Sequence, residues 1–125
     1  NKICIISAKD KVKYHAAAAI ASNLVVGLID LSEKLLMECG FERDEAGDAL
    51  APIVWGNIKH ILNNGVVEAL TGPIERGDAD TIKKHLATIS GNDRETYIAV
   101  SRQVLEVAKR KNKDRDYSKI EEILK

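Results

Sequence analysis

The chain has 125 residues, of which 45% are hydrophobic and 30% are charged. This composition is typical of one soluble globular domain and excludes a disordered chain. Lysine and arginine together number 19, as do aspartate and glutamate, so the formal net charge is zero. Since nucleic-acid-binding domains usually carry a basic excess, we expect no nucleic-acid partner.

No signal peptide is visible, and the apolar stretch 16–29 contains Ser22 and Asn23. It is shorter than the roughly 18 uninterrupted residues that a membrane-spanning helix needs. We therefore expect no membrane contact and a cytoplasmic location. Cys4 and Cys39 lie far apart without a CxxC motif, which indicates buried small side chains in a reducing compartment, with a disulfide as the alternative.

The short apolar run "ICIIS", residues 3–7, predicts a β-strand. Because one strand is not stable alone, it must pair with a sheet outside these residues or add to the edge of a partner's sheet. We therefore expect two segments: residues 1–7 as a linking strand, and residues 8–125 as a helical domain.

The rest of the chain predicts helices joined by short breaks. Ser7 with Asp10 resembles a capping box, and Gly40 supplies a stop, so one helix of about 30 residues is expected over 10–39. A second helix is expected over 44–64, kinked by Pro52 and ended by Gly65. After a loop over 71–78, Asp78 is an expected N-cap. Further helices are expected over 79–89, 94–111 and from Ser118 onward, so that the fold class is all-α, a bundle around one long N-terminal helix.

The stretch "YHAAAAIASN", residues 14–23, places polar side chains at the two ends of a row of small residues. From Tyr14 to Leu31 the predicted helix is apolar nearly all round, which is typical of a helix covered on most sides. At 100° per residue, Ser22 lies about 20° from the direction of His15 and Asn23 about 80° from it. These residues and Ala19 therefore form one stripe, where a small polar molecule could lie in a shallow trough.

A second interpretation of the same residues stays open. Buried polar groups need hydrogen-bond partners in any fold, so His15 and Asn23 could simply satisfy neighbouring backbone groups. A metal site is not expected: His15, His60 and His85 fall on three different predicted helices, without a second ligand at metal-binding spacing. Trp55, three residues after Pro52, is expected to anchor packing.

The strings "KVKYHAAAAIASN" and "LTGPIERGD" together resemble a C-terminal helical domain, catalogued as of unknown function, of Rossmann-like oxidoreductases. These enzymes are related to ketopantoate reductase, pyrroline-5-carboxylate reductase and 6-phosphogluconate dehydrogenase. The resemblance spans about residues 7–108. It implies that an N-terminal Rossmann domain binds NADP, while the helical domain dimerises and closes over the nicotinamide.

The resemblance also implies roles for single residues. His15 and Asn23 would be the catalytic residues facing the nicotinamide, with Tyr14 and Ser22 beside them at the substrate. Thr71, Gly72 and Pro73 would form a loop near the same trough. The chain departs from the whole enzyme in one respect, since it contains no G-x-G-x-x-G motif for the cofactor phosphates.

We therefore expect the C-terminal dimerisation and substrate-side domain of an NADP-dependent oxidoreductase, inactive as this chain alone. The reaction would be hydride transfer on a small carbonyl, imine or alcohol, and the partners a second copy of the chain and a small-molecule substrate. The alternative is a self-standing helical interaction module without catalysis, whose 3–7 strand augments a partner's sheet.

Overall fold

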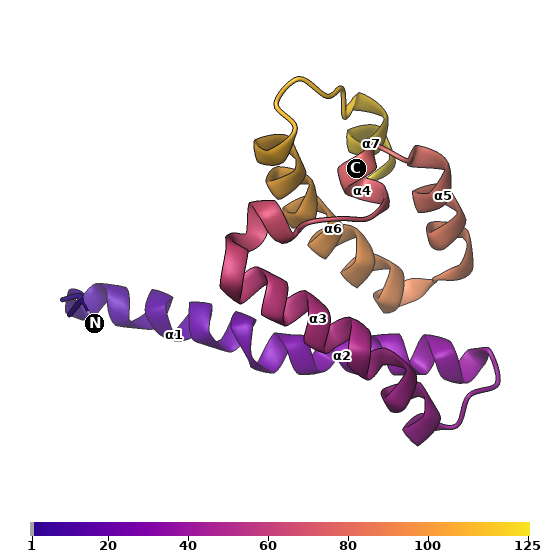
Figure 1. The fold of residues 1–125 in the computed structure, drawn as a ribbon, viewed down its shortest axis with the longest axis horizontal. Helices are drawn as coiled ribbons and strands as arrows, with labels where there is room; N and C mark the ends of the chain where they lie inside the picture. Colours follow the sequence, from indigo (N-terminus) through magenta and orange to yellow (C-terminus); the bar gives the residue numbers. More distant parts are fainter. Residues whose placement is uncertain (1) are drawn as a thin grey trace. The chain divides into compact units, whose positions relative to one another are not determined.

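The computed structural model describes residues 2–125, which are mostly helical and contain no β-strand within that range. The predicted all-α fold class is therefore confirmed. The chain forms two compact units (Figure 1), the first reaching to Ala51 and the second running from Pro52 to Lys125. Each unit is described by itself.

The first unit consists of a long helical segment and the beginning of the next helix. A 3₁₀ turn, η1, spans Ala8–Asp10 and leads into α1, Lys11–Ala21, and α2, Asn23–Glu38. The helix α3, Arg43–Ala69, starts in this unit. The predicted helix over 10–39 has nearly the expected extent, and Gly40, with a φ of 102°, follows the end of α2 as expected. Its interruption at Ser22 was not predicted.

The interruption has a local cause in the Ser22 side chain. The Ser22 backbone N–H bonds to the Ala19 carbonyl, three residues back, at 3.3 Å. The Ala18 carbonyl would normally accept that N–H, and it accepts the Ser22 hydroxyl instead, at 2.6 Å. Serine bonding back to the i−4 carbonyl competes with the helical hydrogen bond and bends helices. The sequence therefore encodes two helices in succession, α1 and α2.

Arg43 joins α2 to the start of α3. Its Nη1 atom lies 3.1 Å from Asp30 Oδ1 and 3.0 Å from Glu33 Oε1. Gly47 lies at the same place, since a Cβ atom added to it would be 3.3 Å from Glu33 Oε2. The missing side chain at Gly47 therefore gives the Glu33 carboxylate room beside α3.

Residues 2–7 have no regular secondary structure. A strand needs hydrogen bonds to a neighbouring strand, and the described residues offer none, so the strand expected over 3–7 as a link to another sheet stays a prediction. Ile3 and Ile5 are 91% and 93% exposed. The expected burial of Cys4 and Cys39 is wrong, since both are free and exposed.

The second unit contains the rest of α3 and four further helices. These are α4, Pro73–Arg76; α5, Ala79–Thr88; α6, Gly91–Lys111; and α7, Ser118–Ile123. Helical geometry in α3 is interrupted at Gly65, whose φ of 84° and ψ of 167° are open mainly to glycine. The expected end at Gly65 is thus confirmed, while the backbone angles at Pro52 stay helical.

A single hydrophobic core holds the second unit together. The apolar positions of α5 and α6 recur at helical spacing and point inward, as the periodicity predicted. Tyr117 and α7 close the core from the C-terminal side. The buried members of the core are Ile74, Ile82, Leu86, Leu105, Ala108, Tyr117, Ile120 and Leu124.

Two aspartates cap the helices that cover this core. Asp78 Oδ1 accepts the Thr81 backbone N–H at 3.1 Å, and Asp78 Oδ2 accepts the Thr81 hydroxyl at 2.7 Å. The predicted N-cap at Asp78 is confirmed. At α7, Asp116 accepts the Ser118 backbone N–H at 2.9 Å, and Ser118 is the first helical residue.

We predict that the Asp78 cap makes the stability of the second unit pH-dependent. The hydrogen bonds from the Thr81 hydroxyl and backbone N–H lower the pKa of Asp78 from its ordinary 3.8. A carboxylate whose pKa is lower in the folded state stabilises the fold at any pH well above 3.8. This stabilisation is lost as the pH falls through the lowered pKa. Asp78→Ala should lower the melting temperature at pH 7, whereas Asp78→Asn, still a good N-cap, should lower it less.

The matched comparison is a melt series of the native protein and Asp78→Asn from pH 7 to pH 2. The difference in melting temperature between them should shrink as the pH falls below 3.8, because Asp78 then takes up a proton in the unfolded chain before it does in the folded one. A difference that stays constant over this range would show that Asp78 acts without its charge.

Candidate functional site

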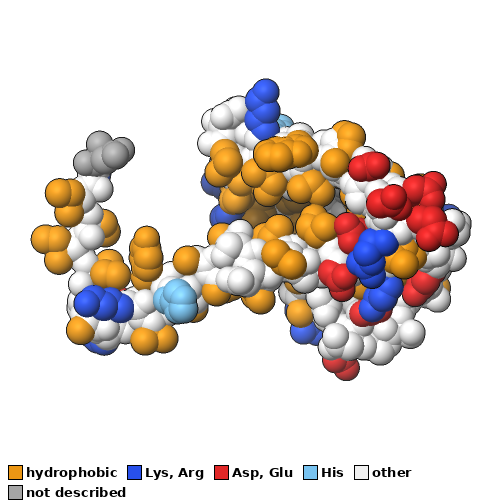
Figure 2. All heavy atoms as spheres, turned by 90° about the horizontal axis from the view of Figure 1, so that it is seen from below, with side chains coloured by type: hydrophobic (Ala, Val, Ile, Leu, Met, Phe, Trp, Pro, Cys, Tyr) orange, Lys and Arg blue, Asp and Glu red, His pale blue; other side chains and the backbone are white. Residues whose placement is uncertain are grey.

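The α1 helix presents its apolar side chains to solvent. No residue of α1 or α2 is buried in this chain. Val12 is 77% exposed, Tyr14 68% and Ile20 59%. Figure 2 shows hydrophobic side chains, in orange, along the N-terminal helical segment at its left, among the white surfaces of the backbone and other side chains. An apolar surface of this extent is unusual for a monomer and marks an interaction surface.

The four predicted residues of the first unit, Tyr14, His15, Ser22 and Asn23, are all exposed. Within residues 2–125 the His15 ring has no hydrogen-bond partner. His15 is therefore not a core residue of this chain, and the interpretation that it satisfies a neighbouring carbonyl receives no support from contacts here. Its ring nitrogens are open to a group supplied from outside the described residues.

Ser22 and Asn23 touch each other at the junction of α1 and α2. Ser22 Oγ lies 3.3 Å from Asn23 Oδ1. A hydroxyl has one proton, and the shorter contact of 2.6 Å to the Ala18 carbonyl uses it. Most of the bonding capacity of the amide is thus available to a ligand.

The predicted residues Thr71, Gly72 and Pro73 lie in the second unit, in the turn between α3 and α4. Gly72 has a φ of 102°, a conformation that favours glycine, and Pro73 is the first residue of α4. Thr71 is exposed, while Gly72 and Pro73 are half-buried. The loop that was expected over 71–78 therefore contains one helical turn, α4, before the Asp78 cap.

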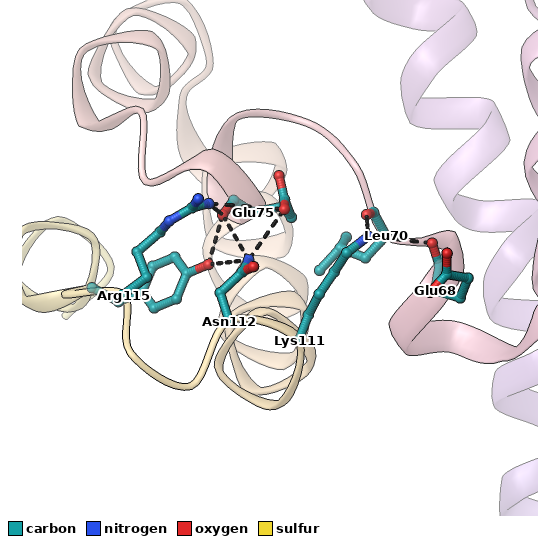
Figure 3. A network of polar contacts seen from close by, with 7 residues as sticks. Glu68, Leu70, Glu75, Lys111, Asn112 and Arg115 are labelled. Carbon is teal, nitrogen blue, oxygen red and sulfur yellow. Dashed lines mark hydrogen bonds and ion pairs between the residues drawn. The ribbon is translucent and has the colours of Figure 1, made fainter.

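Polar contacts from the end of α6 fix both ends of this turn (Figure 3). Lys111 Nζ donates to the Leu70 carbonyl at 2.7 Å and to the Glu68 carbonyl at 3.3 Å. Both carbonyls belong to the end of α3, where a lysine also interacts favourably with the helix dipole. The residue before the turn is thereby tied to α6.

On the other side of the turn, three side chains converge on the Glu75 carbonyl. The Tyr117 hydroxyl and Arg115 Nη1 donate to it, each at 2.6 Å, and Asn112 Nδ2 lies at 3.4 Å. Asn112 Nδ2 also donates to Glu75 Oε1 at 3.1 Å. Figure 3 shows these groups pointing toward one another from α4 and the link after α6. The turn 71–73 is therefore held rigidly in the second unit.

An apolar groove lies next to the turn. It has a volume of about 210 Å³ and is lined by the end of α3 and by α6. Asn57 is its one polar residue; the others are Ile61, Val66, Ala69, Leu70, Val104 and Val107. This lining suits an apolar side chain and offers no acid, base or nucleophile. The groove is a surface for packing, without chemistry of its own.

The structure also shows features of Trp55, His85 and Tyr97 that the sequence analysis did not predict. Trp55 is 75% exposed, so its expected role as a packing anchor is wrong within this chain. His85 Nδ1 lies 2.8 Å from the Tyr97 hydroxyl, and partial burial raises the pKa of Tyr97. Within residues 2–125 no three His, Cys, Asp or Glu side chains gather as metal ligands would.

One finding bears on the expectation of no membrane contact. Counted together as Ala8–Glu38, η1 to α2 form a helical segment whose best 18-residue window has a mean hydropathy of 1.4. By length and composition this segment could cross a membrane, although the uncharged stretch 16–29 alone is shorter. A helix covered by another protein surface passes the same test, so the absence of a membrane partner stays a prediction.

The chain is thus an all-α domain of two parts. The C-terminal unit has its own hydrophobic core, and the N-terminal helices α1 and α2 are apolar and exposed. The chain belongs to the family described as "Domain of unknown function (DUF2520)", whose model matches residues 1–104. No curated protein and no solved structure matches the chain. The match ends inside α6, whereas the core continues to Leu124.

We predict that Tyr117→Phe weakens the anchor of the 71–73 turn. Tyr117 is only 4% exposed, and its hydroxyl donates to the Glu75 carbonyl. Loss of one such bond should lower the free energy of unfolding by about 1 kcal/mol, since the ring still fills the core. Urea denaturation measures the loss, and hydrogen exchange should rise at Gly77 and Asp78, whose backbone N–H groups bond to the Ile74 and Pro73 carbonyls. Equal protection in both proteins would contradict this role.

Proposed function

We propose that this chain is the substrate-side and dimerisation domain of an NADP-dependent oxidoreductase. The observation that carries the proposal is the exposed helical segment of α1 and α2, in which the imidazole of His15 and the amide of Asn23 lie at the two ends of a row of alanines. An apolar helix with free polar groups is suited to lie against another surface with a small molecule enclosed between them. The resemblance of residues 11–23 and 70–78 supports the same role.

The proposed roles of the site residues follow from the chemistry of their side chains. His15 would give or take a proton at the carbonyl oxygen or imine nitrogen of the substrate, as histidine side chains do in general acid–base catalysis. Asn23 would orient the same polar group by hydrogen bonds. Tyr14 and Ser22 flank them, and the alanine row lets a ligand approach the helix closely. The resemblance also assigns a substrate-side role to Thr71, Gly72 and Pro73, which form a turn within the second unit.

The residues of this chain do not form a dinucleotide site by themselves. Its glycines are not spaced as G-x-G-x-x-G, and neither unit offers a glycine-rich turn between a strand and a helix. NADP would supply the hydride chemistry when held by a Rossmann domain. We therefore propose that about 130–150 further residues encoded upstream provide this domain, an extent typical of one domain. An initiator Met codon directly before Asn1 would argue against this.

The alternative function, an interaction module without catalysis, is favoured by one observation. Residues 3–7 are apolar, exposed and without regular structure, as expected for a segment that pairs with another sheet. Such pairing also fits a link to a Rossmann sheet. The two functions differ in whether His15 matters for turnover.

We predict that His15→Ala, in the protein with its cofactor domain, lowers turnover by about a hundredfold or more. Affinity for NADP should change little, because the cofactor phosphates are bound elsewhere. Asn23→Ala should change turnover and the Michaelis constant together, because it acts on orientation. Steady-state kinetics and NADPH fluorescence titration measure these quantities.

Lys11→Ala is a matched control, since it removes a neighbouring exposed side chain from the same helix. The Lys11→Ala variant should have the same turnover as the native enzyme, because the proton-transfer step does not involve Lys11. Thermal melts of all three variants exclude unfolding as the cause. A His15→Ala enzyme that is less stable but fully active per folded molecule would return this residue to a structural role.

A further inference from the structure

The boundary between the two units of the chain falls inside a helix. It lies between Ala51 and Pro52, within α3. A helix that runs from one unit into the next is a rigid link only where its hydrogen bonds are complete and its side chains are packed. The part of α3 directly after the boundary, residues 52–57, is here called the junction segment, and it is weak in both respects.

A proline interrupts the helical hydrogen bonds at the start of the junction segment. Pro52 has no backbone N–H, so the bond that a helical residue 52 would donate to the Asp48 carbonyl is missing. The proline ring also crowds that carbonyl. The backbone angles at Pro52 nevertheless stay helical. The helix is therefore continuous but weakened at this point.

A glycine weakens the helix again one turn later. Gly56 follows Pro52 by four residues, and glycine is less favourable than alanine in a helix interior because it loses more backbone freedom on folding. A close neighbour can require a glycine, as Glu33 does at Gly47. At Gly56, no atom of residues 2–125 outside the surrounding helix backbone lies within 4 Å of an added Cβ atom. Gly56 therefore makes the helix less rigid without serving its packing.

The side chains of the junction segment give it little support. Ile53 and Trp55 are 67% and 75% exposed, and none of residues 52–57 is buried. In other parts of α3, Ala46 and Ala69 are buried. Segments with few packed side chains and exposed backbone hydrogen bonds are those that open most readily in a native protein.

We propose that the junction segment 52–57 is a hinge, at which the two units of the chain change their mutual orientation. Hinges are short stretches between more rigid bodies that absorb changes in the backbone angles. The second unit has its own hydrophobic core. In the first unit, Arg43 fixes the start of α3 to Asp30 and Glu33. Bending is therefore concentrated in the weak stretch of helix between these two fixed parts.

The hinge goes beyond the proposed function and does not depend on it. One consequence does rest on that function: a hinge would allow the unit that contains His15 and Asn23 to move away and release product, a step that limits turnover in many enzymes. The hinge itself is measured in the 125-residue chain without cofactor or substrate. A failure of either proposal therefore leaves the other unaffected.

The first test is native-state hydrogen exchange along α3. After correction for intrinsic rates, the amides of residues 53–57 should exchange at least about tenfold faster than those of residues 58–62. Pro52→Ala combined with Gly56→Ala, the stiffened variant, should remove this difference, because alanine is the best helix former. The matched control is Gly27→Ala, since Gly27 also has no atom within 4 Å of an added Cβ atom. It should leave exchange at 53–57 unchanged.

The second test measures distances with pairs of spin-labelled cysteines. Cys39 is exposed in the first unit, and Lys83→Cys adds an exposed site in the second, with Cys4→Ser to remove the other thiol. The reference is a pair within the second unit, Lys83→Cys with Gln103→Cys, in a chain without native cysteines. Dilution with unlabelled chain restricts the signal to distances within one molecule. The pair across the junction should give the broader distribution, and the stiffened variant should narrow it.

Three results would overturn the hinge. The first is exchange at 53–57 as slow as at 58–62. The second is a distance distribution across the junction as narrow as that of the reference pair. The third is a stiffened variant with a distribution as broad as the native one, because the motion would then lie outside residues 52–57. Circular dichroism checks that each variant keeps its helix content.

Discussion

An apolar helix that the chain itself does not cover is the constraint on which the rest of this molecule depends. Apolar area in water carries a free-energy cost of roughly 25 cal/mol per Å², so α1 and α2 gain stability from whatever covers them. Within the first unit, only the start of α3 packs on α2, fixed by Arg43 between Asp30 and Glu33. The first unit therefore derives its order from helical hydrogen bonds and this local contact, and its remaining surface is available for association.

The second unit supports itself and thereby gives the chain a rigid part. Its core closes only when α7 is present, because Ile120 and Leu124 are each 1% exposed. The polar contacts around the Glu75 carbonyl fill the remaining bonding capacity at the edge of that core, where an unpaired carbonyl would be costly. As a consequence the 71–73 turn is fixed by residues far along the chain. A fixed turn loses little entropy on binding a ligand, which suits the role proposed for it.

The features that the sequence predicted well are those decided by neighbouring residues. Periodicity located α5 and α6, and local backbone rules located the break at Gly65 and the cap at Asp78. The features it missed depend on groups far away or absent. Cys4, Cys39 and Trp55 are exposed because nothing in this chain lies over them. The convergence of Tyr117 and Arg115 on Glu75, some 40 residues earlier, had no signal in spacing or composition.

In the candidate site, too, the sequence predicted what depends on neighbouring residues and missed what depends on the three-dimensional structure. His15 and Asn23 share a stripe by helical periodicity, but the break at Ser22 was not foreseen, because the serine hydroxyl competes with a helical hydrogen bond only through its actual rotamer. The break separates the register of α1 from that of α2, because the Ser22 N–H bonds to the Ala19 carbonyl, three residues back. His15 lies in α1 and Asn23 in α2, so the angle between their side chains depends on the geometry of the break as well as on the 100° per residue of a regular helix.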